Sequence, residues 1–183
     1  MSAIDHPPTN HELGLVQVYT GDGKGKTTAA LGLALRAAGW GFRSYIGQFM
    51  KGRDYGELHS VARLSPLITI EPYGQPGFVR AGEIAAEDVA LVARGLERVQ
   101  AVLAAGEHQI VVLDEICMAV FFGLTPLQPV LDLIAGRPSG VELVLTGRRA
   151  PQALIDAADL VTEMVEIKHP YQRGIGARRG VEL

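Results

Sequence analysis

The fold is decided by the stretch Thr20-Gly21-Asp22-Gly23-Lys24-Gly25-Lys26-Thr27-Thr28. It follows a short apolar run at 13–20 and opens a run with helical spacing at 27–39. A glycine-rich turn between a strand and a helix is the context in which such a turn binds phosphate. Its glycines let successive N–H groups point inward, and the helix start adds partial positive charge. We therefore predict a P-loop in which Lys26 reaches phosphate oxygens and the Thr27 hydroxyl binds Mg²⁺.

The loop departs from the usual spacing at one position. The standard pattern has a glycine where this chain has Thr20. The loop is thus a variant, and its phosphates need not lie as they do in ordinary nucleotide hydrolases. The alternative is a glycine-rich turn without a ligand, which Gly25-Lys26-Thr27 at the strand–helix junction disfavours.

A second motif consists of four apolar residues at 110–113 followed by Asp114 and Glu115. The pattern is typical of a Walker B element, in which one acid holds Mg²⁺ or its water ligands. In a parallel sheet these acids lie at the same edge as the phosphate loop. The alternative is an acid pair favoured only by the positive end of a following helix.

Apolar strands alternate with helices along the chain, which predicts an α/β fold with a mainly parallel six-stranded sheet and helices on both faces. We expect one domain over 13–183, preceded by a mobile arm at 1–12. The expected strands are 13–20, 43–50, 67–74, 109–115, 140–147 and 160–170. The expected helices are 27–39, a short one after the loop at 51–60, a long amphipathic one within 83–105, one within 124–138, and one opening at 150–158.

The composition narrows the class of protein. The 183 residues are 48% hydrophobic and 20% charged, so a sizeable core can form. The net charge of -3 disfavours general nucleic-acid binding, which needs an excess of basic residues. A single cysteine, Cys117, is typical of a reducing compartment, and we expect it to be a small buried residue rather than a nucleophile. No signal-peptide pattern or long apolar run occurs, so we expect a cytoplasmic protein without a membrane segment.

Several further motifs occur in a fixed order with the phosphate loop. Together they resemble the P-loop corrinoid adenosyltransferases, from about Leu15 to the end of the chain. The segments that carry the resemblance are 20–28, Ala29-Ala30-Leu31-Gly32, Arg36, Gln48-Phe49-Met50-Lys51-Gly52, Val112-Leu113-Asp114-Glu115, Leu145-Thr146-Gly147-Arg148, Ala158-Asp159-Leu160-Val161-Thr162-Glu163 and Lys168-His169-Pro170.

The resemblance implies a RecA-like fold, a homodimer, and a role in the synthesis or salvage of the vitamin B12 coenzyme. The implied reaction moves the 5′-deoxyadenosyl group of ATP to reduced cobalt of cob(I)alamin or cob(I)yrinic acid a,c-diamide, and triphosphate leaves. It also implies Mg²⁺ or Mn²⁺, an electron-donating reductase as a partner, and ATP bound in reverse in the loop. No nucleic-acid or membrane partner is expected.

The resemblance also assigns roles to residues. Lys26, Thr27 and Glu115 are the expected catalytic residues, with Thr27, Glu115 and Asp114 around the metal. The expected ligand-binding residues are Gly21, Asp22, Gly23, Lys24, Gly25, Lys26, Thr27, Thr28, Arg36, Phe78 and Arg148. Asp22 stands where the family has Asn, and Lys24 is either a second phosphate contact or a solvated charge. The alternative for Arg36 is an exposed charge on a helix, and the alternative for Arg148 is an exposed charge in a loop.

On the corrinoid side, Gly77-Phe78-Val79-Arg80 aligns with a Gly-Phe-Thr-Trp segment of the family. Phe78 either lines the corrinoid pocket or packs in the core, and Arg80 replaces the tryptophan. His169 either contacts nucleotide or braces the tail.

Three other functions stay open. An ordinary ATPase or kinase would release ADP. A non-catalytic module would bind ATP or corrinoid without converting it. A RecA-like nucleic-acid motor is disfavoured by the net charge of -3.

Overall fold

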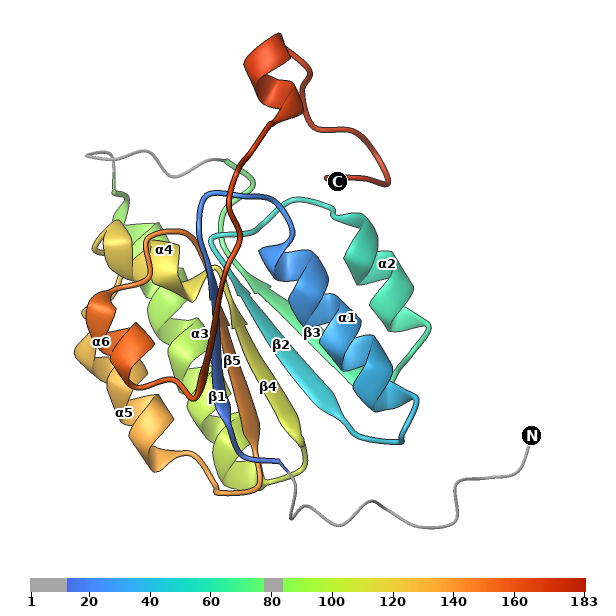
Figure 1. Ribbon diagram of the computed structural model, residues 1–183. Coiled ribbons are helices and arrows are strands. Elements are labelled where there is room, and N and C mark those ends of the chain that lie inside the picture. Colours follow the sequence, from blue (N-terminus) through green and yellow to red (C-terminus); the bar gives the residue numbers. More distant parts are fainter. Residues whose placement is uncertain (1–12, 78–83) are drawn as a thin grey trace.

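The computed structural model describes residues 13–77 and 84–183. It contains a six-stranded sheet, which lies between two layers of helices (Figure 1). The strands are β1 Val16–Thr20, β2 Ser44–Phe49, β3 Ile68–Tyr73, β4 Ile110–Asp114, β5 Glu142–Thr146 and β6 Leu160–Glu163. The helices are α1 Lys26–Ala38, α2 Gly56–Ala62, α3 Ala86–Ala105, α4 Ile116–Phe121, α5 Gln128–Gly136 and α6 Gln152–Asp156, and a 3₁₀ turn, η2, spans Pro170–Arg173. The two expectations for the arm at 1–12 and for Phe78 and Arg80 lie outside the described residues.

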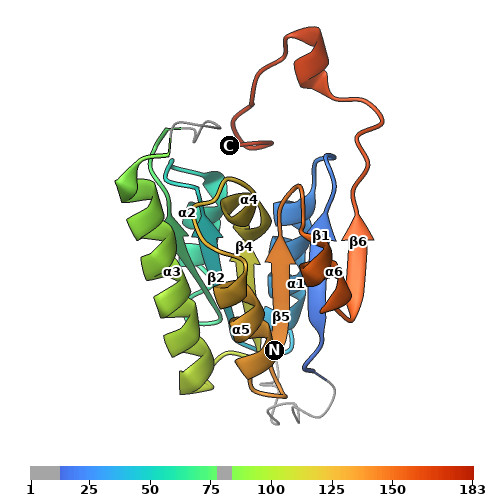
Figure 2. The same cartoon turned by 90° about the vertical axis from the view of Figure 1, so that its left-hand side faces the viewer.

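The strands run in the order β3-β2-β4-β5-β1-β6, and every neighbouring pair is parallel. Helices α1 and α2 lie on one face, while α3, α5 and α6 cover the other (Figure 2). The predicted parallel α/β fold is therefore confirmed. Parallel strands need such crossovers, and burial on both faces explains why the strands are continuous apolar runs.

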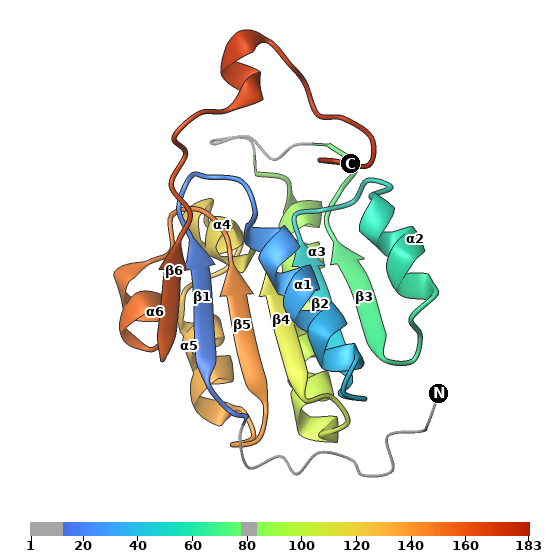
Figure 3. The ribbon, with the colours of Figure 1, turned by 45° about the vertical axis from the view of Figure 1, so that its right-hand side comes forward.

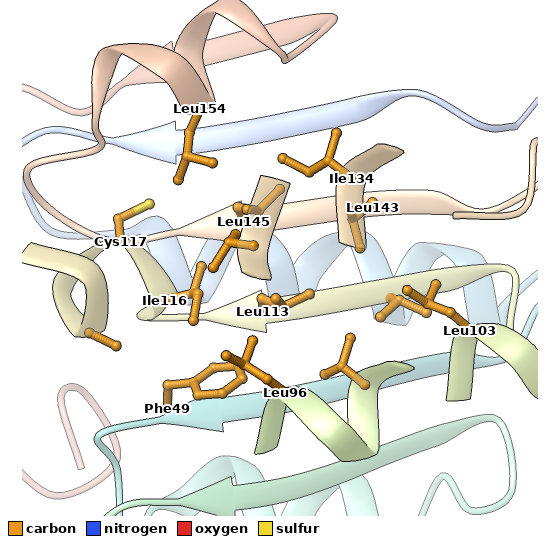
Figure 4. Close-up of a cluster of buried hydrophobic side chains, with 14 of the residues drawn as sticks. Phe49, Leu96, Leu103, Leu113, Ile116, Cys117, Ile134, Leu143, Leu145 and Leu154 are labelled. Carbon is orange, nitrogen blue, oxygen red and sulfur yellow. The ribbon is translucent and has the colours of Figure 1, made fainter. Parts of the chain in front are cut away.

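Alternate residues of the central strands enter two different cores. On β4, Val111 and Leu113 join the core beneath α3 and α5, whereas Ile110 and Val112 join the one beneath α1. This division follows from the two-residue period of a strand. The larger core also contains Phe49 and Cys117 (Figure 4), and burial raises the pKa of the Cys117 thiol to about 12.

The expected strand at 160–170 is wrong at its carboxyl end. Among the described strands β6 pairs only with β1, from Gln17 beside Leu160 to Thr20 beside Glu163, and it stops where β1 turns into the phosphate loop. The chain then rises above the sheet through η2, and its last residues return towards α2 (Figure 3). Within the described ranges, no helix is long and apolar enough to span a lipid bilayer.

Candidate functional site

The candidate site lies where the parallel strands end, because each strand delivers its last residues to the same edge of the sheet (Figure 3). β1 leads into the phosphate loop, and β4 ends at Asp114. Neighbouring β2 and β5 bring Gln48 and Thr146 to this edge.

The phosphate loop is closed around the side chain of Lys26. Gly25 has φ 121° at the helix start, a conformation that glycine adopts without steric cost. The Lys26 ammonium donates hydrogen bonds of 2.7 Å to the carbonyl oxygens of Gly21 and Gly23. The loop is also tied to the segment after β6, since the Gly23 N–H donates to the Met164 carbonyl at 2.7 Å. Burial lowers the pKa of Lys26, and the nearby Glu115 opposes that shift.

Asp114 is fully buried and lies at the centre of a hydrogen-bond network. Its Oδ1 accepts from the hydroxyls of Thr27 at 2.9 Å and Thr146 at 2.6 Å. The Thr146 hydroxyl in turn accepts from the Glu115 N–H at 2.9 Å. The P-loop threonine and the first acid of the Walker B motif are thus in direct contact, whereas the sequence placed them only at the same edge of the sheet.

Lys51 completes this network from the end of β2. Its Nζ donates to Asp114 Oδ2 at 2.7 Å and to Thr27 Oγ1 at 3.0 Å, and Gln48 Nε2 lies 3.3 Å from the same carboxylate oxygen. Burial by itself lowers the pKa of Lys51, but attraction to and hydrogen bonding with Asp114, together with the charges of Glu115 and Glu57, raise it, and the net shift is upward. Sequence reasoning gave Lys51, Gln48 and Thr146 no role in the site. The available signal was their position at the ends of predicted strands.

Glu115 turns the chain from β4 into α4. Its φ of 65° is uncommon for a residue other than glycine, and such strain clusters at functional sites. Burial, followed by repulsion from Asp114, raises the pKa of the Glu115 carboxyl.

A cavity of about 790 Å³ covers this edge of the sheet. Its walls come from the phosphate loop and α1, from α2, and from the end of the chain. They comprise Gly23, Lys24, Gly25, Lys26, Thr27, Thr28, Leu31, Lys51, Tyr55, Gly56, Glu57, Ser60, Glu115, Met118, Arg148, His169, Gly180, Val181, Glu182 and Leu183. A second cavity of about 230 Å³ shares Lys51, Tyr55, Glu115 and Met118 with the first.

The cavity brings together most, but not all, of the residues expected in the site. Gly21 and Asp22 belong to the loop but do not line the cavity. Arg36 also lies outside the lining, in the last turn of α1. Arg36 lies ten positions after Lys26 on α1, a separation of about 15 Å along the helix, which carries Arg36 away from the loop.

The oxygen atoms gathered here fit a hard divalent cation. Thr27, Asp114 and Glu115 offer a hydroxyl and two carboxylates, the ligand types that Mg²⁺ prefers. The Gln48 Oε1 atom is buried without a hydrogen-bond partner among the described residues, which leaves an acceptor for a metal-bound water. In the described part of the chain, no group of three or more His, Cys, Asp or Glu side chains could hold a metal by itself. The remaining ligands would be phosphate oxygens and water, as is usual for Mg²⁺ at nucleotide sites.

The parallel sheet, the phosphate loop and the facing acids define a P-loop nucleotide-binding protein. Two solved structures have a similar fold. A KaiC-like protein of Pyrococcus horikoshii OT3 aligns with a TM-score of 0.52 and 18% identity, covering 82% of this chain and 72% of that one. The cytoplasmic domain of the Thermomonospora curvata type VII secretion ATPase EccC aligns with a TM-score of 0.50 and 16% identity, covering 90% of this chain and 22% of that one. At these identities the likeness concerns the fold alone.

Sequence comparison identifies the family. Residues 12–183 match the family described as ATP:corrinoid adenosyltransferase BtuR/CobO/CobP. The corrinoid adenosyltransferase of Pseudomonas aeruginosa is 36% identical over 173 residues, covering 94% of this chain and 85% of that protein. Corrinoid adenosyltransferase CobA of Salmonella typhimurium is 33% identical over 178 residues, which cover 93% of this chain and 86% of that protein. The chain belongs to the ATP:corrinoid adenosyltransferase family and is a transferase, which confirms the resemblance seen in its motifs.

Proposed function

We propose that the chain transfers the 5′-deoxyadenosyl group of ATP to the reduced cobalt of a corrinoid and releases triphosphate. The observation that carries this assignment is the pair of adjoining cavities at the phosphate loop. The phosphate loop lines the larger cavity. The smaller cavity adjoins the larger one, and the two share a wall formed by Lys51, Tyr55, Glu115 and Met118. A nucleotide in the first cavity and the reacting part of a second substrate at the mouth of the other would meet at this wall.

The proposed step is a nucleophilic displacement at C5′ of ATP. The electron pair of cobalt(I) forms the cobalt–carbon bond, and cobalt becomes formally cobalt(III). The C5′–oxygen bond breaks, and its electron pair leaves with triphosphate. No proton is transferred, so the protein needs no general base and contributes chiefly by holding C5′ in line with the cobalt.

The leaving triphosphate gains negative charge, which the loop can stabilise. The Lys26 ammonium and the N–H groups at the start of α1 are preorganised donors at this position. Arg148 and Lys24 add positive charge in the same cavity, and both are exposed to it. Gly21 and Asp22 do not line the cavity, so their contribution is to the conformation of the loop and not to direct contact with the triphosphate.

Thr27, Asp114 and Glu115 would hold the Mg²⁺ or Mn²⁺ that accompanies the nucleotide. When bound, such an ion neutralises charge on the phosphate oxygens. The protein's part is to hold these ligands in place. The Thr146 hydroxyl donates to the Asp114 carboxylate and accepts from the backbone N–H of Glu115, and the Thr27 hydroxyl donates to the same carboxylate.

We also propose that the enzyme is a cytoplasmic homodimer that receives reduced corrinoid from a reductase, in the synthesis or salvage of the B12 coenzyme. Support for a dimer comes from apolar side chains exposed beyond β6, where Val165 is 69% and Ile167 is 86% exposed. Sedimentation of the purified protein tests this part, and a monomer at micromolar concentration would contradict it.

The function itself is tested anaerobically with ATP, Mg²⁺ and chemically reduced cob(I)alamin. The proposal predicts a corrinoid absorbance spectrum that reverts on illumination, as expected of a cobalt–carbon bond. An unchanged spectrum with folded, ATP-binding protein would contradict adenosyl transfer to this corrinoid, and the assay is then repeated with cob(I)yrinic acid a,c-diamide.

A further inference from the structure

The ammonium group of Lys51 takes the place of a cation between the phosphate loop and β4. It bonds to Asp114 Oδ2 at 2.7 Å and to Thr27 Oγ1 at 3.0 Å. These are two of the three side chains that the proposed function assigns to the divalent metal. The Asp114 side chain is 0% exposed and that of Lys51 only 17%, so water screens the pair weakly.

A divalent cation bonded to Thr27 and Asp114 would lie within a few ångströms of this ammonium. Two unpaired positive groups at that distance repel strongly in a buried setting. We propose that Lys51 and the divalent cation are alternative occupants of the Thr27–Asp114 position, the lysine holding it in the protein without nucleotide and leaving it when the metal arrives. This inference rests on the metal site of the proposed function.

The lysine has a reason to occupy this position before the nucleotide binds. A buried carboxylate without a partner is strongly destabilising. Lys51 supplies the opposite charge, and it also keeps the Thr27 hydroxyl and the Asp114 carboxylate together. Lys51 is therefore a positioning residue that preserves the geometry of the two metal ligands.

An alternative place for the displaced ammonium is close by. Its Nζ already lies 5.6 Å from the centre of the Tyr55 ring, within cation–π range. Both residues line the wall shared by the two cavities. Metal binding would thus move a positive charge from the buried carboxylate to the boundary between the two substrates.

The test measures Mn²⁺ binding without nucleotide, by the loss of the free-ion electron paramagnetic resonance signal. We expect Lys51→Met to bind Mn²⁺ at least about tenfold more tightly than the unchanged protein, since its carboxylate has lost the competing cation. Lys24→Met removes an equal charge from the exposed part of the same cavity and should change the affinity less than twofold. Lys51→Arg keeps a cation and should stay close to the unchanged protein.

Thermal unfolding of the same proteins separates competition from a purely structural role. Lys51→Met should unfold at a lower temperature than the unchanged protein, and Mn²⁺ should restore more of that loss than it adds to the unchanged protein. A lower unfolding temperature that Mn²⁺ does not restore, or equal or undetectable Mn²⁺ affinity in both proteins, would overturn the proposal. Lys51→Gln serves in the same measurements if the methionine variant fails to fold.

The metal site itself is examined separately, by measuring Mn²⁺ binding in the presence of ATP. Asp114→Asn should weaken it in a protein that retains Lys51. An unchanged affinity there would contradict the proposed metal ligands, whereas the Lys51 comparison without nucleotide tests only the competition.

Discussion

Lys26 holds the phosphate loop in its curved form through two carbonyl oxygens, those of Gly21 and Gly23. Its ammonium is therefore placed before the nucleotide binds, at the point where the triphosphate gathers charge. A donor positioned in this way is most effective when negative charge builds up on a leaving group.

The first prediction concerns this charge. Lys26→Ala should lower kcat/KM for ATP by about 100-fold or more, the usual loss when one preorganised donor is removed. Steady-state rates of corrinoid adenosylation measure it, with Arg94→Ala on the exposed side of α3 as the control. A loss smaller than tenfold would show that Lys26 does not contact the leaving group.

The second prediction uses the raised pKa of Glu115, which burial and then Asp114 cause. A folded-state pKa above the unfolded one means that the ionised carboxylate destabilises the fold, and that stability falls as pH rises through this window. Glu115→Gln should therefore be more stable than the unchanged protein at pH 8. Its advantage should shrink as the pH falls towards 4.5, the ordinary value for a glutamate.

Urea unfolding of the metal-free proteins across this pH range provides the measurement. A glutamine variant that is equally or less stable at pH 8 would contradict the assigned environment of Glu115.

At this scale, the sequence predicted those residues whose motifs have fixed spacing. Lys26 and Thr27 are recognisable because they lie between a predicted strand and a predicted helix, and Asp114 and Glu115 because they follow a predicted apolar strand. Lys51 was not predicted as part of the site, because its contact with Asp114 depends on β2 lying beside β4. That adjacency is a property of the sheet, and the local sequence shows only that Lys51 follows a predicted strand.

Among the elements, α3 packs unusually close to the sheet at Gly95. A Cβ added there would lie 2.7 Å from Phe49 Cε1 and 2.8 Å from Tyr73 Cγ. Phe49 is 0% exposed and cannot move into solvent. The glycine therefore sets how closely the helix approaches β2 and β3.

The third prediction compares this glycine with one in α1. Gly95→Ala should lower the free energy of unfolding by about 1–3 kcal/mol through overpacking, despite the better helix propensity of alanine. Gly32→Ala, where a Cβ meets nothing within 4 Å, should instead raise it by about 0.5–1 kcal/mol. Denaturant unfolding of both variants measures these changes in the free energy of unfolding. If Gly95→Ala were stabilising, α3 would be free to shift away from the sheet.

Element boundaries were predicted well where a local signal marks them. The long helix ends at Gly106 in the left-handed conformation, as expected of a C-terminal glycine. Helix α4 was not predicted, because Ile116–Phe121 is short, apolar throughout and follows the acids directly. The excess length predicted for β6 had a similar cause, since its apolar pattern continues beyond Glu163 while its partner β1 does not.

In the molecule as a whole, distant segments meet above the carboxyl ends of the strands. The phosphate loop, α2 and the last four residues of the chain line one cavity. The tail is shaped by Arg178, whose guanidinium pairs with Glu182 and lowers the pKa of that carboxyl to about 2. The parallel α/β class followed from the alternation of strands and helices, but the return of the tail to the cavity did not.

The fourth prediction follows from the tail's position in the cavity wall. Bound ATP should slow tryptic cleavage after the exposed Arg178 and Arg179 several-fold, because the nucleotide fills the space that the tail adjoins. Mass spectrometry of the digest gives the rates, and a small peptide substrate shows whether ATP affects the protease itself. Equal cleavage rates with and without ATP would place the nucleotide away from the tail.

The proposed reaction breaks the bond between C5′ of ATP and the triphosphate. The most direct measurement is phosphorus-31 nuclear magnetic resonance of the products, after a reaction of the unchanged protein with ATP and reduced corrinoid. We expect one inorganic triphosphate for each adenosylated corrinoid, and neither product with Lys26→Ala on the same timescale. ADP and orthophosphate, with the corrinoid unaltered, would contradict it and identify an ordinary nucleotide hydrolase.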